Sequence, residues 1–465
     1  MVDSIPVECD EEVSVATSVM WFRRDLRLSD NPALVEAVAD AGRGEGVVAL
    51  FCLDNRLVRS SGTPREAFLY RCLRALDESI GGRLVVRRGD PAEVVPAIAA
   101  EAGAERVHAA ADFGPYGSAR DDLVERNLAD TDVELRLVGS PYAVAPGTVL
   151  TAAGEPYKVF TPFSRAWRAV GWDAPRRAPA AVRWVEVAER FGIPKEPACD
   201  ARLPVAGEPG AKRAARRFWD RTLDDYDRLR NLPGDDATSR LSPHLKFGTI
   251  HPRQLLAKLG SSKAHGTFRT ELCWREFYAD VLYARPDTAW QSLQPAMRAM
   301  PVDAGADADE RFQAWAEGRT GFPFVDAGMR QLLAEAWMPN RVRMVVASFL
   351  VKDLHLDWTR GAAHFMAHLV DGDLASNQHG WQWTAGTGTD PAPYFRIFNP
   401  ISQGERFDPD GTYVRRWVPE LQTVSDRFVH RPWDDPAGPS EGYPPPMVDH
   451  GVEREEALRR YATTR

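Results

Sequence analysis

A short stretch between residues 238 and 248, TSRLSPHLKFG, gathers groups that bind anions. It holds three hydroxyl side chains and Arg240 at the expected start of a helix. Such hydroxyls can cap the free backbone N–H groups of a helix, and the same donors with an arginine suit a phosphate or pyrophosphate. The residues fit both interpretations, a capped helix and a phosphate-binding loop.

The segment ELCWREFY, residues 271–278, combines an acid, aromatics and an arginine. Residues three and four positions apart are neighbours on a helix, so Glu271, Trp274, Arg275 and Tyr278 share one face. This face could bind a flat polar ligand, with Trp274 stacking on it and Glu271 as hydrogen-bond partner. The alternative is a seam between helices that carries a surface ion pair.

A second helical face, in NRVRMVVASFL, residues 340–350, mixes polar and apolar groups. Asn340, Arg343, Met344 and Ala347 share it. A polar, a charged and a thioether group on an otherwise apolar helix favour the wall of a cavity over a plain core.

Two aspartates, Asp371 and Asp373, precede Asn377 in DGDLASN. Paired carboxylates can bind a divalent cation, but few further oxygen ligands surround them, and Arg343 is an equally good partner. We therefore expect no metal site.

Two tryptophans, Trp381 and Trp383, flank one glutamine in SNQHGWQWTAGTGTDPAPYFRIFNP, residues 376–400. The rest of this stretch is largely Gly, Thr, Asn, Asp and Pro, which are typical of loops and turns. The composition therefore predicts an aromatic loop here.

The spacing of apolar residues divides the chain into regions of different secondary structure, and these regions must position the groups described above. Residues 14–140 alternate short β-rich runs with helical stretches, which predicts a doubly wound parallel sheet of the α/β class. Residues 141–209 are dense in Pro, Ala, Gly and Arg and are expected to form a linker with short helices. Residues 210–465 carry helical apolar spacing, which predicts an all-α domain. The predicted strands cover residues 15–22, 46–54, 83–89, 105–112 and 132–139, and the predicted helices include residues 31–41, 63–80, 211–229, 266–284, 322–337 and 340–356.

Composition narrows the class of protein. Hydrophobic residues make up 44% and charged residues 27%, which is ordinary for globular proteins and excludes global disorder. The five cysteines form no CxxC pair, and no apolar run reaches the ~18 residues of a membrane span, so we expect a soluble cytoplasmic protein. A net charge of −8 argues against general nucleic-acid binding, although arginines beside aromatics leave a local basic face.

The stretch after the first predicted strand disfavours an NAD-type enzyme. It reads MWFRRDLRLSDNPAL and contains no GxGxxG. Taken alone, its two arginines and aspartate can be explained by a solvated turn with an ion pair.

Six segments, taken together and in order, resemble the photolyase/cryptochrome family over nearly the whole chain. They are MWFRRDLRLSDNPAL, TSRLSPHLKFG, ELCWREFY, GFPFVDAGMRQL, WMPNRVRMVVASFLVKDLHLDW and DGDLASNQHGWQWTAGTGTDPAPYFRIFNP. The resemblance implies an α/β domain that holds a light-harvesting antenna, joined by a long linker to a helical domain that buries FAD.

The resemblance also implies the residues that hold FAD. Asn377 matches the residue that faces the flavin N5, where photolyases carry Asn, plant cryptochromes Asp and animal cryptochromes Cys; this favours repair over signalling. The matching FAD residues are Tyr226, Thr238, Ser239, Arg240, Leu241, Ser242, Arg275, Arg343, Asp371, Asp373 and Asn377.

The implied substrate is a cyclobutane pyrimidine dimer flipped out of UV-damaged DNA. Asn340 and Met344 stand where (6-4) photolyases carry His, which favours the cyclobutane dimer. Reduced FAD excited by blue light would donate an electron that splits the dimer, with Glu271, Asn340, Met344 and Asn377 as catalytic residues and Glu271 bonded to the pyrimidine carbonyls. The residues that match dimer and DNA contacts are Arg230, Glu271, Trp274, Asn340, Arg341, Met344, Trp383 and Gln403, with Arg396 as a further rim arginine.

Flavin reduction in the family usually uses three tryptophans. Trp381 and Trp358 match the inner two, whereas the outer position falls on Gly305, or on Val302 if the preceding segment holds an insertion. Neither residue is redox-active, so we expect slow photoreduction or another outer donor. The candidates are Trp315 and Trp290.

The antenna is implied by two further matches, Asp112 and Lys246. The segment ADFGPYG has Gly114 where relatives commonly have Glu. We expect 8-hydroxy-5-deazaflavin, with methenyltetrahydrofolate or no antenna as alternatives.

The implied activity is light-dependent repair of cyclobutane pyrimidine dimers, a carbon–carbon lyase reaction, by a monomer that does not bind membranes. The alternative is a cryptochrome-like blue-light photoreceptor without repair activity.

Overall fold

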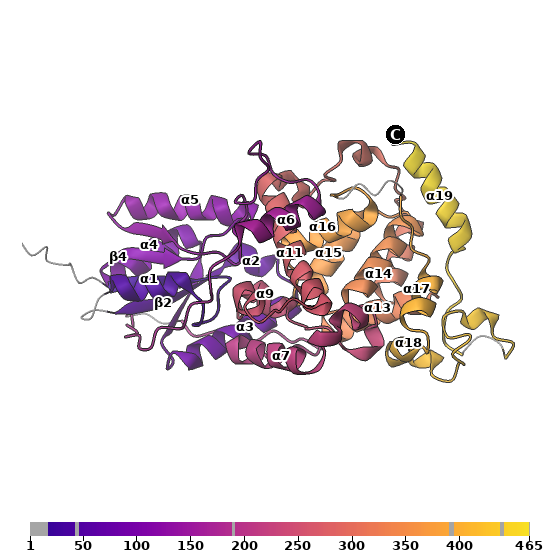
Figure 1. Ribbon diagram of the computed structural model, residues 1–465, viewed down its shortest axis with the longest axis horizontal. Coiled ribbons are helices and arrows are strands. Elements are labelled where there is room, and N and C mark those ends of the chain that lie inside the picture. The colour runs from indigo at the N-terminus through magenta and orange to yellow at the C-terminus, as the bar shows by residue number, and fades with distance from the viewer. Residues whose placement is uncertain (1–16, 42–45, 188–190, 390–394, 438–440, 465) are drawn as a thin grey trace, which may run out of the picture.

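The computed structural model describes residues 17–41, 46–187, 191–389, 395–437 and 441–464 (Figure 1). An α/β lobe formed by the first part of the chain lies beside a larger helical lobe. Cys9, Ser14 and Arg465 lie outside the described residues, so the outer limits of the predicted domains are not covered.

The α/β lobe contains, among the described residues, one five-stranded parallel sheet in the order β3-β2-β1-β4-β5. The prediction of a doubly wound parallel sheet is confirmed. Its strands are β1 Thr17–Phe22, β2 Val47–Asp54, β3 Leu84–Gly89, β4 Ala104–Ala109 and β5 Glu134–Leu137.

Both faces of this sheet are buried because helices cover each of them. Along β1, Val19 and Trp21 point into one apolar cluster and Met20 and Phe22 into the other, as the two-residue period of a strand requires. The second cluster also takes in Trp337 of the helical lobe, so one core spans both lobes. The helices here are α1 Pro32–Asp40, α2 Asn55–Arg59, α3 Thr63–Ser79, α4 Pro91–Ala102 and α5 Pro115–Ala129.

Capping residues fix where these helices begin and end. Asn31 accepts a hydrogen bond from the Leu34 N–H at the start of α1, and Asp90 accepts one from Ala92 at the start of α4. Gly103 ends α4 in the left-handed conformation that glycine adopts without strain.

The segment between the lobes holds one described α-helix, α6 Phe160–Val170, and is otherwise made of turns and irregular chain. It is fastened to both lobes. Trp167 of α6 donates to Glu276 in the helical lobe, and Trp184 pairs with Val47 at β2.

The remaining described residues are helical, as predicted, and no helix among them is long and apolar enough to cross a membrane. The predicted helix over 211–229 is wrong in one respect, because it breaks after Arg221 and resumes at Tyr226. The α-helices are α7 Gly207–Arg221, α8 Tyr226–Leu229, α9 Ser242–Phe247, α10 Pro252–Leu256, α11 Lys263–Ala284, α12 Ala306–Ala316, α13 Pro323–Glu335, α14 Asn340–Lys352, α15 Trp358–His368, α16 Leu374–Ala385, α17 Pro400–Phe407, α18 Thr412–Trp417 and α19 His450–Ala462.

The predicted aromatic loop is wrong for its first half, which forms the helix α16. Asp373 caps this helix by accepting a hydrogen bond from the Ser376 N–H. Buried Gln378 and Gln382 donate to the carbonyls of Ala289 and Thr288, so polar side chains that suggest a loop make tertiary hydrogen bonds. Packing has overridden local composition here.

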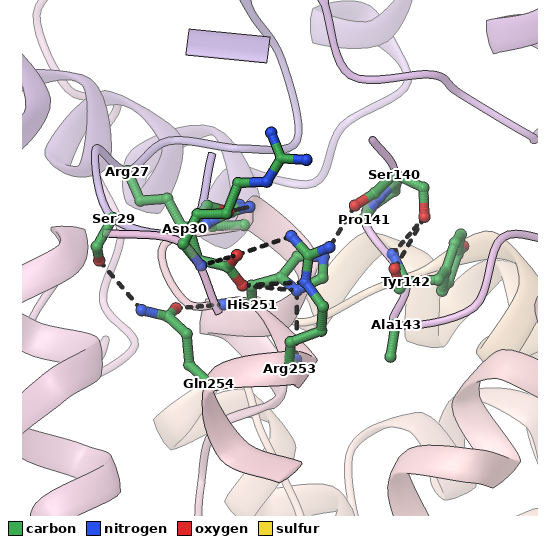
Figure 2. Close-up of polar contacts among 12 residues, drawn as sticks. Arg27, Ser29, Asp30, Ser140, Pro141, Tyr142, Ala143, His251, Arg253 and Gln254 are labelled. Atoms are coloured by element: carbon green, nitrogen blue, oxygen red, sulfur yellow. Dashed lines mark hydrogen bonds and ion pairs between the residues drawn. The ribbon is translucent and has the colours of Figure 1, made fainter. Parts of the chain in front are cut away.

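A buried polar network joins the two lobes (Figure 2). Asp30, in a left-handed backbone conformation, accepts hydrogen bonds from Arg253 at 2.7 and 3.3 Å and lies 3.2 Å from the Nδ1 of His251. The Nε2 of His251 meets the carbonyl of Ser140 at 2.9 Å. Nearby, Gly248 approaches the Arg24 carbonyl so closely that any Cβ would overlap it. The lobes are therefore held together by specific contacts.

Candidate functional site

A cavity of about 500 Å³ opens in the helical lobe. Its walls come from α11, α14, α16 and the 238–242 loop, which are far apart in the sequence. The predicted residues that line it are Tyr226, Arg230, Thr238, Ser239, Arg240, Leu241, Ser242, Lys246, Glu271, Trp274, Arg275, Asn340, Arg341, Arg343, Met344, Asp371, Asp373, Asn377, Trp381 and Trp383.

The polar face of α11 lines this cavity, as its spacing predicted. Trp274 stacks on Phe160 of α6 with ring centroids 3.6 Å apart. Arg275 donates to the carbonyls of Pro141 and Leu245 at 3.1 and 3.2 Å. Glu271, Trp274, Arg275 and Tyr278 all line the cavity. The alternative of an interhelical seam with an ion pair is correct in part, because Trp274 also packs on α6 and Glu271 pairs with Arg230.

Glu271 forms an ion pair with Arg230 at 2.6 Å. Burial raises the pKa of the Glu271 carboxyl, and the charge of Arg230 opposes this shift. Arg341, on the same side, lies over the ring of Phe407 at 4.5 Å. This part of the cavity thus carries one acid and two arginines that can meet a polar, anionic ligand.

The face of α14 also lines the cavity. The amide Nδ2 of Asn340 lies 3.8 Å from the sulfur of Met344. Arg343 donates to Asp371 at 2.8 Å and to the carbonyl of Met338 at 2.9 Å. The arginine is therefore the partner of Asp371, and the described residues contain no cluster suited to a metal ion.

Asp373 meets positive charge from both lobes. Arg24, which follows β1, pairs with it at 2.7 Å, and Lys246 lies 3.8 Å away. Burial alone would raise the pKa of Asp373, but the charges of Arg24, Lys246 and Arg275 hold it below its ordinary value. The interpretation of the RRD stretch as a solvated turn is wrong, since Arg24 reaches the site.

The two predicted antenna residues belong to different lobes. Asp112 accepts from Arg120 at 3.3 Å, and although burial alone would raise its pKa, Arg120 and neighbouring arginines lower it to about 2. Burial lowers the pKa of Lys246 to about 8. Lys246 lines the main cavity, whereas Asp112 belongs to the α/β lobe.

The 238–242 loop does not cap the helix that follows it. Leu241 is the N-cap residue of α9 and makes no side-chain cap bond. Ser242 instead accepts from the indole of Trp337 at 3.1 Å, and Arg240 has a positive φ of 49°. The capped-helix alternative is therefore wrong. Sequence reasoning also missed Trp337, although it lies in the quoted WMPNRVRM segment.

Three buried polar atoms at the cavity lack a hydrogen-bond partner among the residues that the structure describes. They are the hydroxyl of Thr238, one carboxylate oxygen of Asp371 and the indole N–H of Trp381. Buried polar groups are nearly always paired, so these atoms indicate a bound polar molecule. Donors and acceptors beside aromatic walls fit a flavin dinucleotide.

Asn377 and the predicted electron carriers lie on one side of the cavity. Asn377 donates to the carbonyl of Ala362 at 3.1 Å. Trp315 is fully buried and edge-on to Trp381, with ring centroids 6.1 Å apart. The indole of Trp358 donates to the hydroxyl of Ser292 at 3.2 Å. Trp290 precedes Ser292 by two positions in the sequence and is 67% exposed. Trp315 thus neighbours the inner tryptophan, and Trp290 is the surface candidate.

Two predicted DNA contacts lie apart from the cavity lining. Gln403 is on α17, and its buried amide oxygen has no partner within the described residues. Arg396 lies over the ring of Trp383 at 5.8 Å and so flanks the cavity without lining it.

The fold and the site define a two-lobed protein, in which a doubly wound α/β lobe is fastened to a helical lobe that holds an aromatic and polar cavity. Residues 268–463 match the family model for the FAD binding domain of DNA photolyase, and residues 18–181 match that for DNA photolyase. The chain therefore belongs to the DNA photolyase family.

Individual relatives agree over almost the full length. The chain is 42% identical to a deoxyribodipyrimidine photo-lyase of Streptomyces griseus, covering 94% of this chain and 97% of the relative. A bacterial class III photolyase from Agrobacterium tumefaciens superposes with a TM-score of 0.89 at 37% identity, covering 98% and 99% of the two chains. An archaeal photolyase from Sulfolobus tokodaii, solved with two FAD molecules, superposes with a TM-score of 0.85 at 28% identity, covering 96% and 99%.

Proposed function

We propose that this protein is a deoxyribodipyrimidine photo-lyase, which uses light to split cyclobutane pyrimidine dimers in UV-damaged DNA. One observation carries the proposal: the residues that match the flavin site and, apart from Gln403, those that match the dimer site line the same cavity. A flavin and a flipped dimer would thus lie next to each other. Proximity of this kind favours electron transfer without a diffusing carrier.

The described residues suggest how the two molecules are held. Thr238, Arg343 and Asp371 would contact the flavin, because they offer unpaired or charged groups deep in the cavity. FAD, when bound, supplies the light-driven electron. Trp274 and Trp383 would enclose the dimer, and Asn340 would donate its amide hydrogens to it.

Glu271 would bind the pyrimidine carbonyls. Burial raises the pKa of its carboxyl against the charge of Arg230, so taking up a proton and donating a hydrogen bond costs less here than for an exposed carboxyl. A donor at this position stabilises charge that appears on the carbonyls when the dimer accepts an electron.

The decisive test is loss of dimers from an oligonucleotide under blue light, with the flavin chemically reduced beforehand. We expect repair in light and none in the dark. Glu271→Gln should slow repair by about tenfold or more. Dimers that persist in light with fully reduced flavin would contradict the proposal and favour the photoreceptor alternative.

Binding of damaged DNA provides a second test. Arg341→Ala should weaken binding and flatten its salt dependence, because each phosphate contact releases counterions. The control is Arg126→Ala on α5, which removes the same charge at an exposed position of the other lobe. Equal effects of the two variants would contradict this placement of the DNA.

The antenna, the outer electron donor, the cytoplasmic location and the monomeric state stay predictions. For the antenna we propose 8-hydroxy-5-deazaflavin near Asp112, where buried arginines supply donors for its oxygen atoms. Absorption spectra of protein produced with and without deazaflavin would identify it.

Transient absorption of Trp290→Phe would test the outer donor, since loss of the long-lived tryptophanyl radical is expected.

A further inference from the structure

A buried lysine lies behind the rim of the cavity. Lys352, the last residue of α14, is only 2% exposed, and none of the described ion pairs involves it. The neighbouring Asp353 carboxylate favours the charged amine, but it is already bonded to His450, so the buried amine forms no ion pair of its own. Burying such an amine is costly, whereas methionine could fill similar space without that cost. Fold stability alone therefore does not explain a lysine here.

The amine of Lys352 holds one short segment, Phe395–Phe398. Its Nζ donates to the carbonyl of Arg396 and lies 4.2 Å from the ring centroid of Phe395. One turn earlier on α14, the hydroxyl of Ser348 accepts from the Phe398 N–H at 3.3 Å. Two residues of one helix thus fix this segment at both of its ends.

The far side of the segment is also supported. Phe395 stacks on Tyr461 of the C-terminal helix α19, with ring centroids 4.4 Å apart and planes 11° from parallel. Gly386, at the end of α16, leaves room for the Phe395 ring, since a Cβ there would lie 2.9 Å from it. Phe395 is therefore wedged between α14, α16 and α19.

The held segment carries a charge to the rim of the cavity. Arg396 lies over the ring of Trp383 at 5.8 Å, and Trp383 lines the cavity. We propose that Lys352 is a positioning residue, which fixes the Phe395–Phe398 segment so that Arg396 and Trp383 meet a damaged DNA strand in one geometry. This inference rests on the proposed function. Burial lowers the pKa of Lys352 to about 7, in keeping with an amine that acts through hydrogen bonds rather than as a surface cation.

The test is a double-mutant cycle on binding of a dimer-containing oligonucleotide in the dark. Lys352→Met and Arg396→Ala should each weaken binding by about tenfold. If Lys352 acts through Arg396, Lys352→Met should have little further effect in the Arg396→Ala background. Independent effects that multiply, or unchanged binding by Lys352→Met, would overturn the inference.

Controls separate positioning from misfolding and from failure of the proposed function. Flavin content and the repair yield of DNA-saturated Lys352→Met should match the parent protein. If Lys352→Met does not fold, Ser348→Ala removes the second contact, and its expected two- to threefold loss should also vanish in the Arg396→Ala background. A parent protein that neither binds nor repairs dimers would refute the function itself, whereas normal binding by the parent and by both α14 variants would refute only this inference.

Discussion

The network between the lobes and the wall of the cavity are both rich in buried polar groups, but they differ in how completely these groups are paired. Asp30, His251 and Arg253 satisfy one another and the backbone, and none has a buried atom without a partner. At the cavity, Thr238 and Asp371 each leave a buried atom unpaired. Arg27, which bonds the Asp30 carbonyl, leaves its Nε unpaired within the described residues. Since unpaired buried groups are costly, Asp30, His251 and Arg253 need no further partner, whereas the wall of the cavity is built for a ligand.

The largest expected effect is on the cavity ion pair. Arg343→Leu leaves the buried carboxylate of Asp371 without its partner, so we expect the free energy of unfolding to fall by about 3–5 kcal/mol. Flavin should be lost as well. Urea unfolding and the ratio of flavin to protein absorbance after gel filtration measure the two effects. Full flavin content in this variant would place the flavin elsewhere.

Removing the central acid of the interlobe network should act on stability alone. Asp30→Asn tolerates the left-handed backbone but leaves Arg253 without a carboxylate, which should cost about 3 kcal/mol. Flavin affinity of the folded protein should not change, because Asp30 does not line the cavity. A selective loss of flavin would remove the distinction between the two regions.

Acid should weaken the interlobe network through His251. Burial lowers the pKa of this histidine from 6.5 to about 4. The unfolded chain therefore takes up a proton as the pH falls through 6.5 while the folded chain does not, so stability falls with pH in this window, by about 2 kcal/mol between pH 6.5 and 5. Burial would raise the pKa of the Asp30 carboxyl, but its contacts with His251 and Arg253 lower this pKa to about 2. The protonation of Asp30 therefore changes only below this window.

The check is urea unfolding at pH 6.5 and 5 for the parent protein and His251→Gln. The variant should lose less stability on acidification; an equal loss would contradict the assignment. Other histidines contribute alike to both proteins, and those with lowered pKa values are His108, His244, His364, His379 and His430.

The smallest expected effect is at an unpaired hydroxyl. Thr238→Val should leave the stability of the flavin-free protein within about 0.5 kcal/mol, because no protein hydrogen bond is lost. Flavin affinity should fall by about fivefold to tenfold. The matched control is Thr249→Val, whose hydroxyl bonds His244 at 2.8 Å. That variant should lose about 1 kcal/mol of stability and keep its flavin affinity. The reverse pattern would contradict the comparison.

Periodicity predicted much of this molecule, because apolar spacing reports which side of an element is buried. The five strands and the cavity faces of α11 and α14 follow from it. Composition failed at α16, where Gln378 and Gln382 bond carbonyls more than 80 positions away in the sequence. The prediction of a solvated turn at Arg24 failed as well, because its partner Asp373 lies in the other lobe. Both errors concern long-range polar contacts, which leave no local pattern.

The close contact of Gly248 with Arg24 also bears on how this chain could have evolved. The backbone carbonyl of Arg24 contacts Gly248, and its side chain pairs with Asp373, the aspartate that caps α16. A helical lobe transplanted onto a foreign α/β lobe would lose both contacts, and with them a charge that faces the cavity. The two lobes are therefore not interchangeable modules, because each relies on a residue that the other supplies at their seam.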